Sequence, residues 1–170
     1  MNRNRIAMTA LFAVVVAGCV HLRASAQSSQ PHPRVIVVGV NGTAQPAFRG
    51  FPAEHPGTNR QLQVTRNCSA VSSACILTRR EVFEQVGGFD EKLSGLLADV
   101  DLCLKMRRAG YLIVYTPFAK LYWHAVQPDN VDAKGETILR QRWADVLECD
   151  PYYNPNLSRE RADFSLEVPP

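Results

Sequence analysis

The sequence predicts a mixed α/β fold, because short apolar runs typical of strands are interspersed with segments typical of helices. The runs 35–40 and 111–115 are rich in β-branched and aromatic residues and are followed by turn signals. Helices are predicted near residues 78–86, 98–109 and 132–148, where apolar residues recur at helical spacing. A length of 170 residues suits a single domain.

The composition narrows the class of protein. Hydrophobic residues make up 46% of the chain and charged residues 21%, which is ordinary for a globular protein. The net charge of +3 is too small to indicate nucleic acid or an anionic membrane surface as a partner. No stretch reaches the roughly 18 consecutive apolar residues that span a bilayer. We therefore expect neither a nucleic-acid partner nor a membrane-spanning helix.

The cysteine pattern argues against a structural metal site. The cysteines are Cys19, Cys68, Cys75, Cys103 and Cys149. None forms a C-x-x-C pair, so a zinc site of the usual spacing is not expected. Cys75 and Cys103 lie in apolar runs and are predicted to be buried free thiols, with a disulfide framework as the less favoured alternative.

Residues 1–30 differ in pattern from the rest of the chain and resemble a secretory signal peptide. Two arginines precede an apolar run at 6–20, and the small-x-small site Ala-Ser-Ala at 24–26 is followed by polar residues. Three alternatives remain open: a lipoprotein cleavage box at 17–19, an apolar helix that stays attached, or a misassigned start. We expect this segment not to pack on the rest of the chain.

Residues 31–61 are predicted to form a loop-rich linker with one short strand at 35–40. The pair Asn41-Gly42 directly after this strand is a turn signal. Three prolines between positions 46 and 56 argue against regular structure as far as Thr58. We expect the linker to be a long loop.

Residues 62–150 are predicted to hold the main folded region. Residues 70–77 are typical of a buried strand or extended segment. A capping box of Thr78 and Glu81 predicts the start of the first helix, because the hydroxyl and the carboxylate can satisfy free backbone N–H groups there. The Gly-Gly pair at 87–88 ends that helix.

The second helix is predicted at 98–109, ending before Gly110, and the third at 132–148. Their expected core residues are Val100, Cys103, Leu104, Met106, Ile138, Trp143, Val146 and Leu147. Another short strand is predicted at 119–125. Residues 151–170 are predicted to be an irregular tail, because the stretch begins with several Pro and Asn residues.

Two acidic pairs lie close together in the chain, Asp90-Glu91 and Asp99-x-Asp101. The second pair falls in the first turn of the predicted helix, where the helix dipole favours negative charge. Positions two apart on a helix point to nearly opposite sides, so one carboxylate should face a cleft while the other braces the fold. From the residues alone, a structural role at the helix start is favoured over a catalytic one.

Several blocks of the sequence, in this order, resemble bacterial family 2 glycosyltransferases of the cell-surface polysaccharide and O-antigen group. The blocks are NCSAVSSACILTRREVFEQVGGFDE, DVDLCLKMRRAGYLIVYTPFAKLYWH, DPYYNPNLS and DFSL. The resemblance is strong over residues 62–166, weaker over 35–61 and absent over 1–30. Collinear blocks are far more specific than any single motif.

The resemblance implies a partial GT-A fold, namely its C-terminal, acceptor-side half, and transfer of a sugar from a nucleotide donor to an acceptor hydroxyl. An acidic pair at the start of a helix supplies the general base in this family, and Asp99 matches the position of that base. A carboxylate is needed there because the acceptor hydroxyl must lose its proton as the new bond forms. Ala98 stands where many relatives have Glu, so the acidic pair is incomplete.

The candidate substrate-binding residues are Gly87, Gly88, Phe89, Asp90 and Asp101. The first four match the family's G-G-F-D-E loop, which lines the acceptor pocket, and a helix cap followed by a turn is the alternative role. His124 matches a histidine that approaches the metal and the diphosphate in some relatives, and is the candidate metal ligand. Its alternative role is structural, and Trp123 stands where many relatives have another histidine.

The donor side of the family pattern is not found in this sequence. Relatives bind the nucleotide with an N-terminal βαβ unit that ends in a D-x-D motif holding Mg²⁺ or Mn²⁺. The D-x-D at 99–101 belongs to the base motif, and no acidic residue precedes Glu54. We therefore expect the chain to lack the donor-binding half, to bind no divalent metal alone and to be inactive alone.

The expected partners are a glycan or lipid-linked sugar acceptor and a separate chain that supplies the donor half. The alternative functions are a non-catalytic glycan-binding module and an exported gene remnant. The signal-peptide-like start implies export, whereas the family resemblance implies the cytoplasm or the inner membrane.

Overall fold

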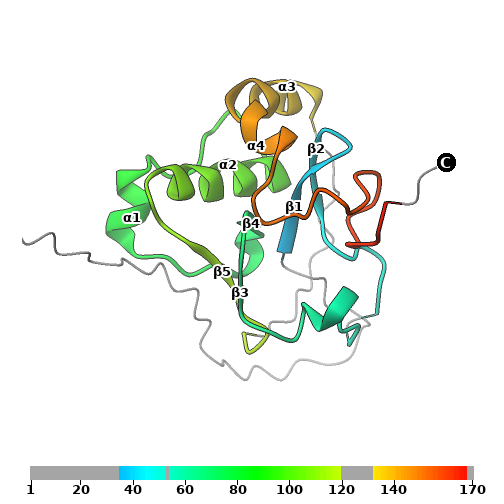
Figure 1. Ribbon diagram of the computed structural model, residues 1–170. Helices are drawn as coiled ribbons and strands as arrows, with labels where there is room; N and C mark the ends of the chain where they lie inside the picture. The colour runs from blue at the N-terminus through cyan, green and yellow to red at the C-terminus, as the bar shows by residue number, and fades with distance from the viewer. Residues whose placement is uncertain (1–34, 53, 120–131, 168–170) are drawn as a thin grey trace, which may run out of the picture.

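The computed structural model describes residues 35–52, 54–119 and 132–167 (Figure 1). The signal-peptide-like segment, Cys19, nearly all of the strand predicted at 119–125, Trp123 and His124 lie outside these residues. Within the described ranges, no helix combines the length and the apolar character needed to cross a membrane.

Strand β1 (Val35–Val40) is the centre of a three-stranded antiparallel sheet. It pairs with β2 (Thr43–Pro46) on one side and with β4 (Ala70–Val71) on the other. All six residues of β1 are buried. Asn41 and Gly42 join β1 to β2 with φ of 51° and 68°, the left-handed values that a two-residue hairpin turn requires. The predicted strand at 35–40 and the turn after it are thus confirmed.

The expectation of a loop-rich linker before residue 62 is wrong for its first part. β2 is a second strand that was not predicted, and Ala47 and Phe48 after it are buried. The proline that argued against a strand is Pro46, which occupies the last position of an edge strand, where a missing N–H is tolerated. The segment 35–48 therefore shares one hydrophobic core with the rest of the described chain.

A second, two-stranded antiparallel sheet consists of β3 (Arg66–Cys68) and β5 (Ile113–Tyr115). The β run predicted at 111–115 is therefore a strand in its last three residues. The extended segment predicted at 70–77 is a strand only in β4, which a 3₁₀ turn at Ser73–Cys75 follows. This turn begins there because the hydroxyl of Ser72 accepts a hydrogen bond from the N–H of Ala74 at 3.3 Å.

Helix α1 (Arg80–Gln85) does not begin with the predicted capping box. Arg79 occupies the N-cap position, and the hydroxyl of Thr78 is buried without a hydrogen-bond partner. Thr78 lies one residue too early for its side chain to reach the first turn. The predicted end is confirmed, since the N–H of Gly88 donates to the carbonyl of Phe83 at 2.9 Å and both glycines at 87–88 have positive φ.

Helix α2 (Gly95–Arg108) is the main helix of the core. It packs on β2, β4, β5 and α3, and Figure 1 shows it between the strands and the two C-terminal helices. Val100, Cys103, Leu104 and Met106 are buried, as predicted. The helix begins three residues earlier than predicted, because burial of Leu97 extends it. A Cβ on Gly135 of α3 would lie 2.8 Å from Leu97 Cδ1, so α2 and α3 approach closely there.

The third predicted helix is two helices, α3 (Ala133–Arg142) and α4 (Ala144–Glu148). They separate at Trp143, which leaves helical geometry with φ of −127° and ψ of 29°. Trp143 is 2% exposed. We attribute the break between the two helices to the burial of its side chain. Leu147 is buried as predicted, whereas Ile138 and Val146 are only half-buried.

Residues 151–167 consist of turns, bends and one isolated bridge between Leu157 and Leu166. They are nevertheless packed, because Tyr153 and Phe164 are buried in the core. The rings of Phe164 and Phe48 stack with their centroids 5.6 Å apart. The C-terminal segment therefore covers the start of the described chain.

The described cysteines, Cys68, Cys75, Cys103 and Cys149, are all free thiols. Cys103 is buried as predicted, and Cys75 is half-buried. Burial raises the pKa of the Cys68 and Cys103 thiols to about 12, so both stay protonated and act as small apolar groups.

Gly39 brings the central strand into close contact with α4. The register of β1 and β2 shifts between Val38 and Val40, and Gly39 lies at this bulge with φ of 90°. A Cβ at this position would lie 2.5 Å from the carbonyl oxygen of Leu147. Only glycine fits there, because both the backbone conformation and the space exclude a side chain.

We expect Gly39→Ala to lower the free energy of unfolding by roughly 2 kcal/mol, the sum of backbone strain and the clash with Leu147. The matched control is Gly50→Ala, because Gly50 has φ of 80° but nothing within 4 Å of its Cβ position. Urea unfolding of both variants separates the two contributions. Equal losses in the two variants would show that the contact with α4 is unimportant.

Candidate active site

Asp99 and Asp101 point from α2 to different partners. The Oδ2 atom of Asp99 accepts a hydrogen bond from the N–H of Ser73 at 3.0 Å, beside the turn after β4. The Oδ1 atom of Asp101 accepts from Arg142 Nη1 at 2.7 Å and from the indole Nε1 of Trp143 at 2.9 Å. The two carboxylates therefore take separate roles, as positions two apart on a helix must.

The environment of Asp99 differs from the one that the sequence predicted. The helix begins at Gly95, so Asp99 lies in its second turn, and the expected stabilisation by the helix dipole is absent. Asp99 is 7% exposed, and burial raises the pKa of its carboxyl above the usual 3.8. Hydrogen bonds from Ser73 and Ser72 act in the opposite direction and favour the ionised form. A carboxylate with a raised pKa accepts a proton more readily.

Asp101 is the buried centre of a charge network that it forms with Arg142, Lys105 and Asp90, whose side chains are partly exposed. Asp101 is fully buried, and its Oδ2 atom lies 3.2 Å from the ammonium of Lys105. The same guanidinium that binds Asp101 reaches Asp90 Oδ2 with its other nitrogen, Nη2, at 2.8 Å. Arg142 thus bridges two carboxylates that lie eleven positions apart in the sequence.

This network also holds the loop of residues 87–90. The ammonium of Lys105 donates to the carbonyl of Gly88 at 2.6 Å, while Arg142 holds Asp90. The pKa of Asp90 is lowered, first by the N–H of Lys92 and then by Arg142, so Asp90 remains ionised. The loop is therefore fixed at both ends to groups that are themselves anchored on buried Asp101.

The predicted glycines and Phe89 have different structural roles. A Cβ on Gly88 would lie 2.9 Å from the ring of Phe83, so the glycine allows this ring to pack beneath the loop. Gly87 has open space at its Cβ position. Phe89 is 44% exposed and meets Phe83 edge to face at 5.6 Å. The loop thus presents one aromatic side chain to solvent over a packed base.

Sequence reasoning missed several residues of this site. Ser72 and Ser73 contact Asp99, and Arg142 and Lys105 hold the loop, yet none of the four was predicted there. The serines follow a strand end, which is a usual place for functional residues, and could have been noticed. Arg142 gives no such signal, because its two partners lie 41 and 52 positions away in the chain.

The described residues do not fit a divalent metal. Among them, no three His, Cys, Asp or Glu side chains converge in a way that could hold a cation. The predicted ligand His124 lies outside the described ranges. Asp99 and Asp101 cannot share one ion either, since their carboxylates bind different partners. No chemical step is therefore assigned to a metal held by these residues.

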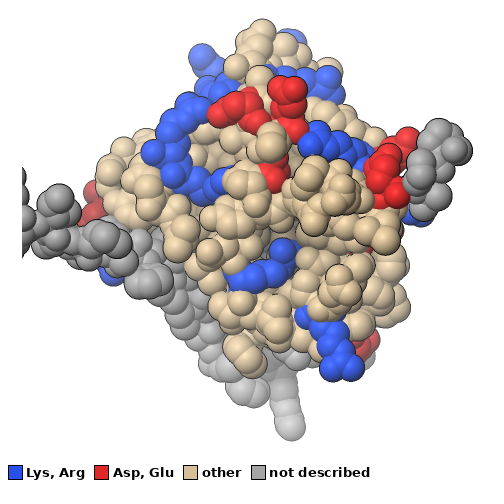
Figure 2. Space-filling view, in the orientation of Figure 1, with Lys and Arg blue, Asp and Glu red and all other residues tan. Residues whose placement is uncertain are grey.

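Charge on the visible face is mixed. Figure 2 shows acidic and basic side chains next to one another over α2, α3 and α4. Two open pockets of about 410 and 450 Å³ lie beside this region and beside the C-terminal segment. Neither is lined by Asp99 or by the loop 87–90.

Comparison with known proteins finds relatives of this chain, two of which are named for steps in polysaccharide synthesis. It is 36% identical over 162 residues to an uncharacterized protein of Sinorhizobium fredii, covering 89% of this chain and 18% of that protein. It is 35% identical over 141 residues to the O-antigen biosynthesis protein RfbC of Myxococcus xanthus, covering 79% of this chain and 11% of that protein.

A third relative has a more specific name. The chain is 34% identical over 124 residues to the N-acetylglucosaminyl-diphospho-decaprenol L-rhamnosyltransferase of Mycobacterium tuberculosis, covering 72% of this chain and 40% of that enzyme. The chain therefore spans less than half the length of each of these relatives. No protein-family model and no solved structure matches it. The named relatives support a glycosyltransferase-like function in the broad sense.

Proposed function

We propose that residues 35–167 form the acceptor-side part of a family 2 glycosyltransferase with a GT-A fold. In this proposal a sugar passes from a nucleotide donor to a hydroxyl of the acceptor. The observation that carries it is the carboxylate of Asp99, which is buried, has a raised pKa and is oriented by the N–H of Ser73. The relatives named for O-antigen biosynthesis and rhamnosyl transfer support the same reaction class.

Asp99 acts as the general base. The acceptor hydroxyl gives its proton to the carboxylate while its oxygen forms a bond to the anomeric carbon of the donor sugar. The bond from that carbon to the diphosphate oxygen breaks, and the nucleoside diphosphate leaves with the bonding electrons. Burial disfavours the charged carboxylate and thereby raises its basicity, which increases the driving force for this proton transfer.

The loop 87–90 lines the acceptor site, and Asp101 supports the loop from beneath. Phe89 offers an exposed ring on which the apolar face of a sugar can pack. Gly88 and Asp90 are held by Lys105 and Arg142, so the loop is ordered before the acceptor binds. Such preorganisation lowers the entropic cost of binding in the reactive geometry.

The nucleotide-binding part of the enzyme lies outside residues 35–167 in this proposal, and a divalent metal would be held there. The acceptor is a glycan or a lipid-linked sugar, in keeping with the decaprenol-linked sugar in the name of one relative. Without the nucleotide-binding part, these residues transfer no sugar.

Two experiments test the proposal. Calorimetric titration of the isolated chain with uridine, guanosine and thymidine diphosphate sugars in Mn²⁺ should show no saturable binding at micromolar strength. A chimera tests transfer, in which residues 35–167 replace the aligned part of the mycobacterial rhamnosyltransferase. We expect it to release nucleoside diphosphate in the presence of acceptor.

Each of the two experiments has an outcome that would overturn the proposal. Micromolar nucleotide binding by the isolated chain would place the donor site within it. A chimera that melts cooperatively and binds acceptor glycan without any transfer would instead favour a glycan-binding module.

A further inference from the structure

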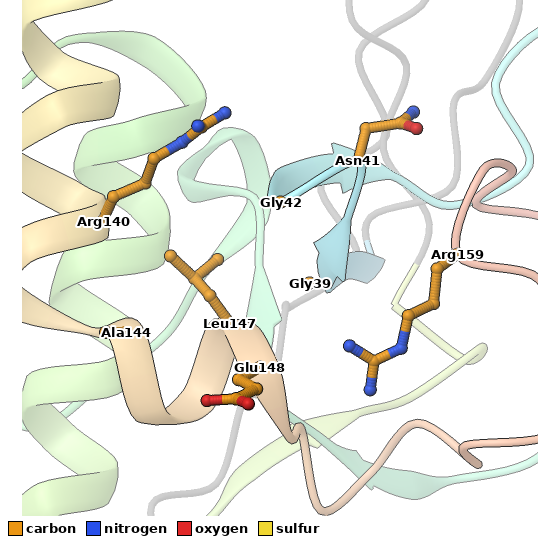
Figure 3. A pocket seen from close by; sticks show the side chains of 8 residues that line it. All are labelled: Gly39, Asn41, Gly42, Arg140, Ala144, Leu147, Glu148 and Arg159. Carbon is orange, nitrogen blue, oxygen red and sulfur yellow. The ribbon is translucent and has the colours of Figure 1, made fainter.

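The pocket of about 410 Å³ lies between the β1–β2 turn, the helices α3 and α4 and the C-terminal segment (Figure 3). Its floor is apolar, formed by Leu147 and by the bare backbone of Gly39 and Gly42. Figure 3 shows the guanidinium of Arg140 at one side of the opening and that of Arg159 at the other. None of these residues belongs to the site around Asp99.

The pocket is preformed by contacts that do not involve these guanidinium groups. The backbone N–H of Asn41 donates to the carbonyl of Arg159 at 2.7 Å. The side-chain Nδ2 of Asn41 donates to the carbonyl of Glu160 at 3.1 Å. These bonds fix the C-terminal segment on the hairpin turn. The close approach of Gly39 to the carbonyl of Leu147 fixes the opposite wall.

The two guanidinium groups are available to a ligand. Arg140 is 54% exposed, and its ion pair with Glu136 is long, at 4.0 Å. Among the described residues, no carboxylate forms an ion pair with the side chain of Arg159. Guanidinium groups bind carboxylates and phosphates with two parallel hydrogen bonds, so both can hold an anion.

The remaining polar groups of the pocket suit hydroxyls. Glu148 points along the edge of the pocket beside Leu147 in Figure 3, where its carboxylate can accept hydrogen bonds from a pair of hydroxyl groups. The volume lies within the range of pockets for small molecules, and an apolar floor can carry the apolar face of a sugar ring.

We propose that this pocket is a second binding site, specific for a sugar that carries a carboxylate or a phosphate. The anionic group pairs with Arg159 at one side of the opening, and the ring lies on Leu147 and Gly39. Its hydroxyls bind Arg140 at the other side and Glu148. This site needs neither the base Asp99 nor the donor nucleotide, so it can be present even where the proposed transfer is not.

The test is titration of the full ¹⁵N-labelled chain, followed by NMR. We expect glucuronate or glucose 1-phosphate to shift the amides of Gly39, Asn41 and Gly42 in a saturable manner, and the probe that binds identifies the anionic group. Arg140→Gln and Arg159→Gln should each weaken the binding by roughly tenfold or more, since each removes a charge-assisted pair. Ala144→Leu, which places a larger side chain in the pocket, should have the same effect.

Arg80→Gln on α1 is the matched control, since it removes the same charge from an exposed helix position away from the pocket and should leave binding unchanged. Glucose or inorganic phosphate alone should bind at least tenfold more weakly. Equal binding of glucose would show that the anionic group is not recognised, and equal binding of phosphate would show that the sugar is not. Either result, or shifts confined to other amides, overturns the proposal.

Discussion

Replacing Asp99 by Asn lowers the turnover of the complete transferase by roughly 10²–10⁴-fold, the usual contribution of a positioned general base. Asn keeps the shape of the side chain, and its oxygen can still accept the hydrogen bond from Ser73 that is 3.0 Å long in the native chain. What it loses is the ability to take a proton. The measurement is the release of nucleoside diphosphate by the chimera described above, at saturating donor and acceptor.

The same variant should lose turnover but gain stability. Unfolding therefore cannot explain the loss of turnover. Burial raises the pKa of Asp99, so the folded chain binds this proton more tightly than the unfolded chain does. Above the raised pKa the buried charge therefore destabilises the fold, and the Asn variant should be more stable than the native chain at neutral pH. As the pH falls through the raised value towards 3.8, the native carboxyl becomes neutral and the difference should close.

The matched control is Asp145→Asn, the same chemical change at an exposed position of α4. It should leave turnover unchanged and stability nearly so. Near-normal turnover of Asp99→Asn would show that another group takes the proton. A stability difference that grows on acidification would contradict the raised pKa.

Replacing Asp101 by Asn lowers the free energy of unfolding by about 3 kcal/mol, near the lower end of the cost of breaking a buried ion pair. Asp101 is fully buried and contacts Arg142, Lys105 and Trp143, so its loss leaves two cations without their shared anion. The side chains of both cations are partly exposed and regain some hydration, which limits the cost. The melting temperature should fall by roughly 6–12 °C for a domain of this size.

Glu136→Gln is the control for this loss, because its ion pair with Arg140 is exposed and 4.0 Å long. Exposed pairs contribute at most about 1 kcal/mol, so its melting temperature should barely change. Differential scanning calorimetry compares the variants. A loss no larger than that of the control would show that the network around Asp101 does not stabilise the fold.

The sequence predicted correctly those elements whose ends depend on residues that are neighbours in the chain. The strand β1, the Asn41-Gly42 turn and the end of α1 at two glycines all depend on a few neighbouring residues. The opposite directions of Asp99 and Asp101 also followed from helix geometry alone.

The predictions of helix boundaries and of site residues were wrong where contacts between residues far apart in the sequence determine the structure. The start of α2 was predicted too late because Leu97 is buried against α3, which no local signal shows. Trp143 interrupts a segment of helical pattern because its indole is buried and bonded to Asp101. The bridge of Arg142 between two carboxylates likewise depends on how α2 and α3 pack. Tertiary packing routinely overrides local preference in this way.

The position of β1 has a consequence for the order in which the chain folds. This central strand contacts α4, and the segment directly after it is hydrogen-bonded to Arg159 and Ala162, more than a hundred residues later. Bringing such distant partners together requires a large loss of chain entropy before any contact compensates for it. During synthesis, the contacts of β1 with α4 and of the following turn with Arg159 cannot form until those residues are made, so the five Val and Ile side chains of β1 stay incompletely covered until then. Such a strand is a natural binding site for a chaperone.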